Sequence, residues 1–103
     1  MARVQSKEDI EISIAKSKEI LDRLGVQFIR LFGSFLRDDI HEDSDIDLLV
    51  DFYPGKKTFD NFMDLAFFLE ASLGRKVELV TPQSLSKHLG PHILKEVEYV
   101  YPS

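Results

Sequence analysis

Eight consecutive residues, Asp45–Phe52, carry an apolar side chain at every even-numbered position. Successive side chains of a β-strand point to opposite faces of a sheet, so these apolar side chains would share one buried face. The side chains of the other face would be Asp45, Asp47, Leu49 and Asp51. Aspartate is disfavoured within strands, and the run Leu48-Leu49-Val50 favours burial on both faces. We therefore predict a central strand whose carboxylates have a function.

Helices and strands alternate along the rest of the sequence. Helical spacing of apolar residues predicts two long helices and one short one, over Ser6–Leu24, Thr58–Leu73 and Pro82–Leu89. Short segments rich in β-branched and aromatic residues predict further strands at Val26–Phe32 and Lys76–Val80. Gly90–Pro91 is expected to break the chain before another helical turn. This order predicts an α/β (α+β) fold, a small mixed β-sheet with helices packed on it.

Composition limits the size of the fold and the kind of partner. At 103 residues the chain is expected to form one domain, residues 1–103, burying roughly two-thirds of its unfolded surface. Phe59, Phe62, Phe67 and Phe68 are assigned to the core. The net charge of −5 disfavours direct binding to nucleic acid or to an anionic membrane. The chain has no cysteine, no membrane span and no signal-peptide core, so a cytoplasmic location is expected.

Asp45 and Asp47 would place two carboxylates on one face at the start of the central strand. Two close anions require a shared proton or a cation, and Mg²⁺ best suits oxygen ligands that leave room for water and phosphate. Glu78, on the outer face of the predicted strand Lys76–Val80, is the third candidate ligand. Three such carboxylates could hold two Mg²⁺ ions about 3.5–4 Å apart for a phosphoryl-type displacement. The alternative is that they are solvated side chains on an outer sheet face.

Gly33 and Ser34 lie at a predicted strand-to-helix turn. Such a turn offers backbone N–H groups, a close approach permitted by the missing Cβ, and a hydroxyl donor, all of which suit phosphate oxygens. Arg37 follows shortly after. Its guanidinium could contact a phosphate, or it could instead pair with Asp38 or Asp39.

Gly33-Ser34, ten intervening residues and Asp45-Ile46-Asp47 form one spaced motif. This motif resembles the Gly-Ser-x10-Asp-x-Asp signature of the minimal nucleotidyltransferases, small members of the DNA polymerase beta superfamily. The likeness extends over most of the chain. It implies the nucleotidyltransferase fold, with a small mixed sheet and helices packed on it.

The resemblance also implies a role for each part of the motif. In that family the two aspartates, here Asp45 and Asp47, bind catalytic Mg²⁺, and the Gly-Ser turn holds the triphosphate of the nucleotide. The third acid, here Glu78, completes the metal site and can help to activate the acceptor hydroxyl. Two positions depart from the pattern: Glu78 stands where aspartate is more usual, and Asp38 follows Arg37 where glycine is frequent.

A partner is implied in the same way. Proteins of this family often act with a small helical HEPN protein, a toxin with ribonuclease character, and neutralise it by transferring AMP from ATP to a toxin tyrosine hydroxyl. The chain is therefore expected to be an Mg²⁺-dependent antitoxin that forms a hetero-oligomer with such a toxin. Two alternatives use the same fold without the transfer. One is a module that neutralises its partner by binding alone, and the other is a sensor that binds ATP without turnover.

Overall fold

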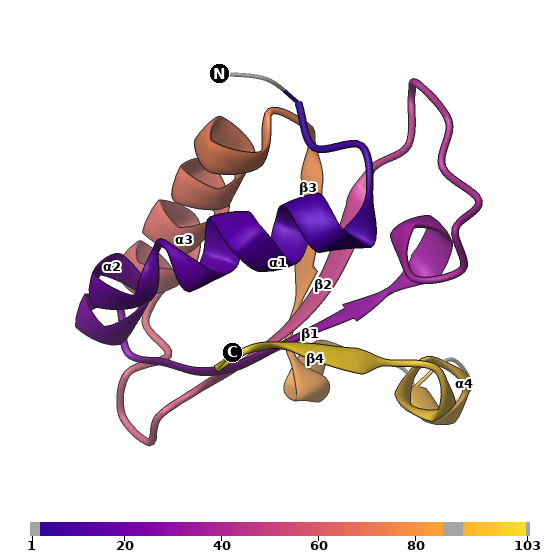
Figure 1. Cartoon of the computed structure of the whole chain (residues 1–103). Coiled ribbons are helices and arrows are strands. Elements are labelled where there is room, and N and C mark those ends of the chain that lie inside the picture. Colours follow the sequence, from indigo (N-terminus) through magenta and orange to yellow (C-terminus); the bar gives the residue numbers. More distant parts are fainter. Residues whose placement is uncertain (1–2, 86–89, 103) are drawn as a thin grey trace.

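Four strands form one sheet within residues 3–85 and 90–102, the part of the chain that the computed structural model describes. The strands are β1 (Val26–Phe32), β2 (Ile46–Phe52), β3 (Val77–Val80) and β4 (Glu98–Tyr101). Their order across the sheet is β3-β2-β1-β4 (Figure 1). Strand β1 pairs antiparallel with β2 and β4, whereas β2 pairs parallel with β3. The predicted mixed sheet and the central position of the acidic strand are confirmed.

One face of the sheet is covered by α1 (Lys7–Ala15), α2 (Lys18–Arg23) and α3 (Phe59–Leu73) (Figure 1). The even-numbered side chains of β2 from Ile46 to Val50 are buried in the core on this face, as the alternation predicts. The helical side chains of this core are Ile10, Ile14, Leu21, Leu65, Leu69 and Leu73. Because the helices lie on one side, the odd-numbered carboxylates of β2 face the other side. There the sheet is accompanied by the 3-10 turn Pro82–Ser84 and by α4 (Gly90–Lys95).

The segment Ser6–Leu24 forms two helices, α1 and α2, and the prediction of a single helix is wrong. At the break the hydroxyl of Ser17 donates to the carbonyl oxygen of Ser13 at 2.9 Å, and the N–H of Ser17 donates to the carbonyl oxygen of Ile14 at 3.0 Å. Serine side chains compete with helical hydrogen bonds in this way. A spacing of apolar residues does not reveal such local competition.

The helix predicted over Thr58–Leu73 is confirmed as α3, but part of its predicted core is wrong. Phe59 and Phe67 are 70% and 62% exposed, whereas Phe68 packs against the core as predicted. The side chains of α3 that face the sheet are Leu65, Leu69 and Leu73. Phe67 lies two residues from both Leu65 and Leu69, which turns it about 160° away from the centre of this stripe, and Phe59 is the first residue of the helix, before the stripe begins. The hydrophobicity of phenylalanine does not show which part of the helix meets the sheet, so burial was predicted wrongly for Phe59 and Phe67.

The C-terminal region differs most from the prediction. The helix predicted over Pro82–Leu89 is a 3-10 turn over Pro82–Ser84, and residues 86–89 lie outside the described part. The helical turn predicted after Gly90-Pro91 is confirmed as α4, which begins at Gly90. Proline fits the first turn of a helix, because its missing N–H needs no partner there. The aromatic end forms β4, which was not predicted because its pairing partner, β1, is distant in sequence.

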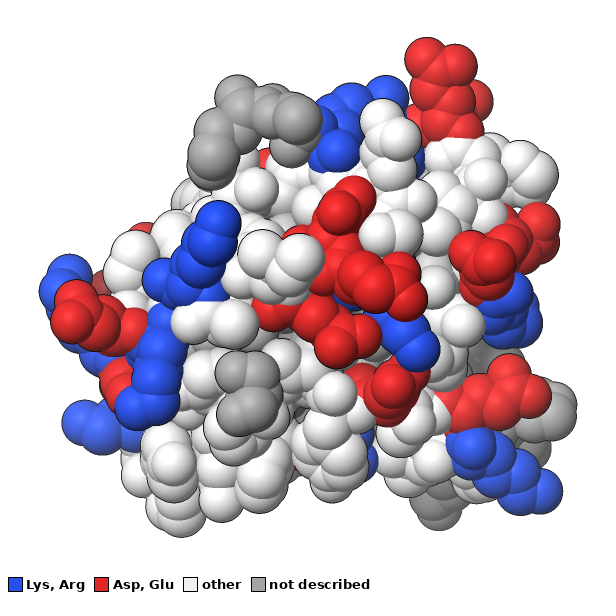
Figure 2. All heavy atoms as spheres, viewed as in Figure 1, with Lys and Arg blue, Asp and Glu red and all other residues white. Residues whose placement is uncertain are grey.

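The described helices are short, and acidic and basic side chains are unevenly distributed over one face of the molecule. Within the described ranges, no helix is both long enough and apolar enough to cross a membrane. Figure 2 shows acidic side chains near the centre of the face that α1 presents and basic side chains mainly toward its edges.

Tyr101 connects the C-terminal strand to α2, and its hydrogen bond gives a test of the fold. The ring is buried, and the hydroxyl donates to Oδ1 of Asp22 at 2.5 Å. Burial and the Asp22 carboxylate raise the pKa of Tyr101 to about 12, so the hydroxyl keeps its proton at neutral pH. We expect Tyr101→Phe to lower the free energy of unfolding by about 1 kcal/mol, measured by urea denaturation. Tyr99→Phe removes the same atom from an exposed ring of β4, and an equal loss in this control would contradict the role of the bond.

Candidate active site

Gly33-Ser34, the candidate phosphate-binding pair, lies where β1 ends. Phe32, the last residue of β1, is the Cα partner of Asp47 in β2. Gly33 follows with a φ of +77° and opens the 3-10 turn Gly33–Phe35. A Cβ at Gly33 would lie 2.1 Å from Oδ2 of Asp47. Only glycine therefore allows the backbone of this turn to lie directly against the carboxylate.

Asp47 and Glu78 lie opposite each other on neighbouring strands. They are Cα partners in the parallel β2–β3 pair, where Asp47 is half-buried and Glu78 is exposed. Burial, followed by the negative charges of Glu78 and Asp45, raises the pKa of Asp47 from 3.8 to about 6. The positive charge of Arg37 acts in the opposite direction. Asp45, Glu78 and Arg37 therefore all lie within electrostatic range of Asp47.

The carboxylates are not assembled into a ready-made metal site. Among the described residues, no group of three His, Cys, Asp or Glu side chains is arranged to hold a metal ion. The chemistry of the donors nevertheless fits a hard cation, because the candidate ligands are carboxylate oxygens whose mutual repulsion a cation would relieve. Adjacent backbone positions already bring Asp47 and Glu78 together, so side-chain movements alone could complete a ligand set.

A cavity of about 340 Å³ opens over Asp47 and Glu78. Its lining residues are Phe32, Asp47, Glu78, Val80, Ser84, Leu85 and Ile93. Phe32 and Val80 were not among the predicted site residues, although strand alternation places Val80 on the same face as Glu78. Ser84, Leu85 and Ile93 were also missed, and the sequence carries no local signal for them. They reach the site because the segment after β3 folds back over the sheet.

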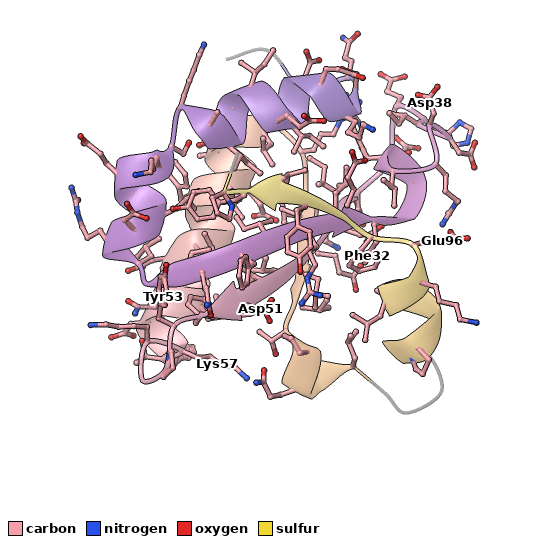
Figure 3. The ribbon with its side chains drawn as sticks, turned by 60° about the horizontal axis from the view of Figure 1, so that its bottom comes forward. Phe32, Asp38, Asp51, Tyr53, Lys57 and Glu96 are labelled. Atoms are coloured by element: carbon pink, nitrogen blue, oxygen red, sulfur yellow. The ribbon has the colours of Figure 1, made fainter. Side chains whose placement is uncertain are left out.

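The turn after Ser34 carries the basic candidate and one unusual backbone conformation. Within the described residues, Arg37 forms no ion pair with Asp38 or Asp39, so this predicted alternative is not observed. Asp38 has a φ of +59°, in the left-handed region. Aspartate thus adopts a conformation that glycine, frequent at this position in the resembled family, adopts without strain. Figure 3 shows Asp38 and Phe32 toward the same end of the sheet.

Comparison with known proteins places this geometry in a family. Residues 14–100 match the model of the nucleotidyltransferase domain. The chain belongs to the nucleotidyltransferase family. This nucleotidyltransferase is 41% identical over 100 residues to the protein adenylyltransferase MntA of Thermococcus cleftensis. The match covers 97% of this chain and 100% of that relative. A relative from Methanocaldococcus jannaschii, named provisionally as a protein adenylyltransferase, is 36% identical over 100 residues, covering 92% and 94% of the two chains.

Solved structures confirm the fold of this nucleotidyltransferase. A chain described provisionally as a minimal nucleotidyltransferase matches with a TM-score of 0.71 and 34% identity, over 91% of this chain and 98% of the other. A chain of a toxin–antitoxin complex with AMP-PNP matches with a TM-score of 0.70 and 26% identity, over 90% and 73%. A chain of the MntA–HepT toxin–antitoxin complex gives a TM-score of 0.59 and 26% identity, over 90% and 73%. The predicted fold class and enzyme class, a nucleotidyltransferase, are thus confirmed.

Ionised Asp47 is expected to destabilise the metal-free protein at neutral pH. Because its pKa is raised from 3.8 to about 6, stability falls as the pH rises from about 4 to about 6, while the unfolded chain has already lost the proton. We expect Asp47→Asn to raise the free energy of unfolding at pH 7.5 by about 1 kcal/mol, a value reduced for partial solvent exposure. The gain should shrink toward zero as the pH falls to 4. Thermal unfolding between pH 4 and 7.5 measures this gain, with exposed Asp43→Asn as the control. If Asp47→Asn has wild-type stability at pH 7.5, the prediction is wrong.

Asp38 offers a second test, of backbone strain. We expect Asp38→Gly to raise the free energy of unfolding by about 0.5 kcal/mol, because relief of the left-handed conformation outweighs the added freedom of the unfolded chain. Asp39→Gly adds the same freedom at the next exposed position, whose φ is not positive, and should destabilise instead. Thermal denaturation of both variants measures the difference. Equal losses would show that the conformation of Asp38 carries no strain.

Proposed function

We propose that this chain is an Mg²⁺-dependent adenylyltransferase that transfers AMP from ATP to a tyrosine hydroxyl of a cognate HEPN toxin and so acts as its antitoxin. The observation that carries the proposal is the pairing of Asp47 with Glu78 beside a glycine turn whose backbone lies against Asp47. Carboxylates next to backbone donors suit a triphosphate that arrives with its metal.

The triphosphate is assigned to the Gly33–Phe35 turn. The first N–H groups of a helical turn have no partner within that turn, so they can donate to phosphate oxygens, and the hydroxyl of Ser34 adds one more donor. Arg37 supplies a positive charge that already acts on Asp47 from the same end of the sheet. Because Arg37 is exposed and pairs with neither neighbouring aspartate, it is free to contact a phosphate.

Asp45, Asp47 and Glu78 are assigned as the residues that would hold Mg²⁺, two ions in the arrangement that we favour. When bound, the metal offsets the negative charge of the phosphates and of the developing transition state. Glu78, the exposed member, can accept the proton of the acceptor hydroxyl. The hydroxyl oxygen then attacks the α-phosphorus of ATP, and pyrophosphate leaves. Burial of Asp47 beside the negative charges of Glu78 and Asp45, which raises its pKa, gives this set a reason to bind a cation.

The walls of the cavity favour an aromatic acceptor. Apolar side chains of Phe32, Val80, Leu85 and Ile93 surround the two carboxylates in the cavity lining. An apolar wall with a polar floor suits a ring that carries one hydroxyl, since the ring is desolvated while the hydroxyl meets the carboxylates. This combination supports a tyrosine as the acceptor.

Relatives and structural neighbours support a toxin partner. The Thermococcus relative is named a protein adenylyltransferase, and two structural neighbours belong to toxin–antitoxin complexes, one of them with AMP-PNP. The exposed rings of Phe59 and Phe67 on α3 lie outside the cavity and could contribute to the contact with such a partner. The second candidate, neutralisation by binding alone, draws on one observation, the lack of three preassembled metal ligands among the described residues.

Intact mass measurement separates the two. We expect a cognate HEPN toxin to gain the mass of one or more AMP groups when it is incubated with this protein, ATP and Mg²⁺. The double variant Asp45→Asn with Asp47→Asn should add none, because its metal ligands have lost their charge. The matched control, Asp43→Asn with Asp64→Asn, makes the same change in charge at exposed positions and should transfer like the wild type.

Unchanged masses in an intact complex would reject transfer and favour neutralisation by binding. Neutralisation by binding alone also predicts that the double variant neutralises the toxin as well as the wild type does. Isothermal titration with ATP and Mg²⁺, giving tight binding without turnover and without a complex, would favour the nucleotide sensor.

A further inference from the structure

One arginine, Arg75, contacts both the loop that leads to Asp45 and the Gly33–Phe35 turn. Arg75, between α3 and β3, donates from Nε to the carbonyl oxygen of Val4 at 2.7 Å. Its Nη1 donates to the carbonyl oxygens of His41, Glu42 and Ser44 at 3.1–3.2 Å. A single side chain therefore binds the N-terminal segment and the loop that precedes Asp45.

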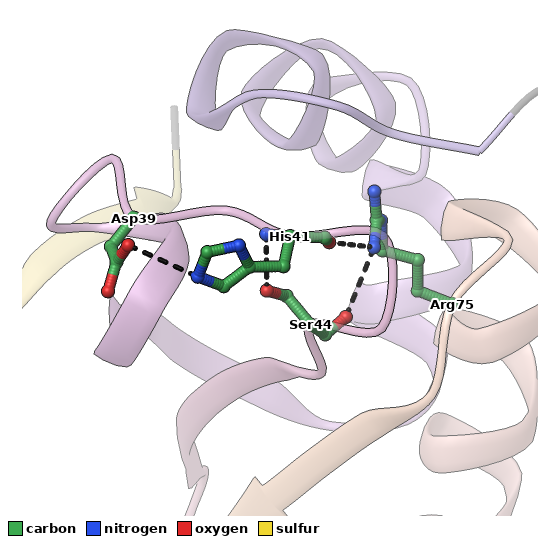
Figure 4. Close-up of polar contacts among 4 residues, drawn as sticks. All are labelled: Asp39, His41, Ser44 and Arg75. Atoms are coloured by element: carbon green, nitrogen blue, oxygen red, sulfur yellow. Dashed lines mark hydrogen bonds and ion pairs between the residues drawn. The ribbon is translucent and has the colours of Figure 1, made fainter.

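The loop that Arg75 binds is closed by its own hydrogen bonds. The N–H of His41 donates to the hydroxyl of Ser44 at 2.7 Å (Figure 4). The N–H of Ser44 donates to the carbonyl oxygen of His41 at 3.1 Å. Both residues also present their carbonyl groups to Arg75 (Figure 4). Asp45 follows directly, so the position of its carboxylate depends on how this turn is held.

The other contact of Arg75 reaches the phosphate-binding turn. Its guanidinium carbon lies 5.0 Å from the centre of the Phe35 ring, within range of a cation–π interaction. Phe35 is the last residue of the Gly33–Phe35 turn and is buried. The turn and the loop that leads to the carboxylates thus rest on the same guanidinium group.

We propose that Arg75 is a positioning residue that fixes Asp45 relative to the Gly33–Phe35 turn, and this role rests on the proposed function of that site. The planar guanidinium has five donors in a fixed fork and a flat face, so it can hold several carbonyl groups while it stacks on a ring. A lysine ammonium has neither the fork nor the face. Arg75 touches no reacting atom, and it acts through the loop and the turn.

The test is Arg75→Lys, with Arg23→Lys, an exposed arginine of α2, as the matched control. Hydrogen exchange should become about tenfold faster at the amides of residues 41–46 in Arg75→Lys, while the amides of β1 keep wild-type rates. The affinity for Mn²⁺, used as the metal probe and followed by electron paramagnetic resonance, should fall about tenfold. The rate of AMP transfer should fall at limiting Mg²⁺ and recover at saturating Mg²⁺. Arg23→Lys should match the wild type in all three measurements.

Wild-type exchange at residues 41–46, or wild-type affinity for Mn²⁺, in Arg75→Lys would overturn the proposal. If Arg75→Lys does not fold, Arg75→Gln, which keeps two N–H donors, replaces it with the same expectations and the same contrary results. If the wild-type protein itself transfers no AMP, the proposed function fails. Exchange and Mn²⁺ binding then still decide whether Arg75 holds the loop.

Discussion

A slip of β2 by one residue would turn Ile46, Leu48 and Val50 away from the helices and drive Asp47 into the core, at a cost that no site could offset. The register of β2 is therefore the constraint on which the rest of the structure depends. It is held on both sides, by antiparallel pairing with β1 and parallel pairing with β3. The same register sets Phe32 and Glu78 on either side of Asp47.

Fixing the carboxylates in this way costs stability in the metal-free protein. Asp47 is half-buried beside two other acids, and its pKa is raised first by burial and then by the negative charges of Glu78 and Asp45. The glycine turn adds a backbone that approaches closer than any side chain would permit. Such arrangements are typical of sites that bind a charged ligand, because the ligand offsets the unfavourable burial and repulsion of the carboxylates.

Residues 38–44, in the connection between β1 and β2, are polar except for Ile40 and mostly exposed, yet hydrogen bonds hold them in place. Asp39 donates its N–H to the carbonyl oxygen of Ser34, and the carbonyl groups farther along the loop converge on Arg75. Polar loops of this kind are usually interpreted from sequence as flexible links. Here the hydrogen bonds come from a residue more than thirty positions away, which explains how a loop whose only apolar residue is Ile40 can position Asp45.

The sequence by itself determined β1, β2, β3 and α3, because period-two and helical patterns report which side chains must be buried. It also placed the side chains of Asp47 and Glu78 on the outer faces of their strands and Gly33 at a turn, since alternation and turn chemistry are local. The split between α1 and α2 is also local, because Ser17 bonds to Ser13 and Ile14, but the spacing of apolar residues does not report it. Only tertiary structure decided the pairing of β2 with β3, the strand β4, the exposure of Phe59 and Phe67, the apolar cavity walls and the contacts of Arg75. Each depends on which distant surfaces meet, and neither a short window of sequence nor the hydrophobicity of one residue specifies that.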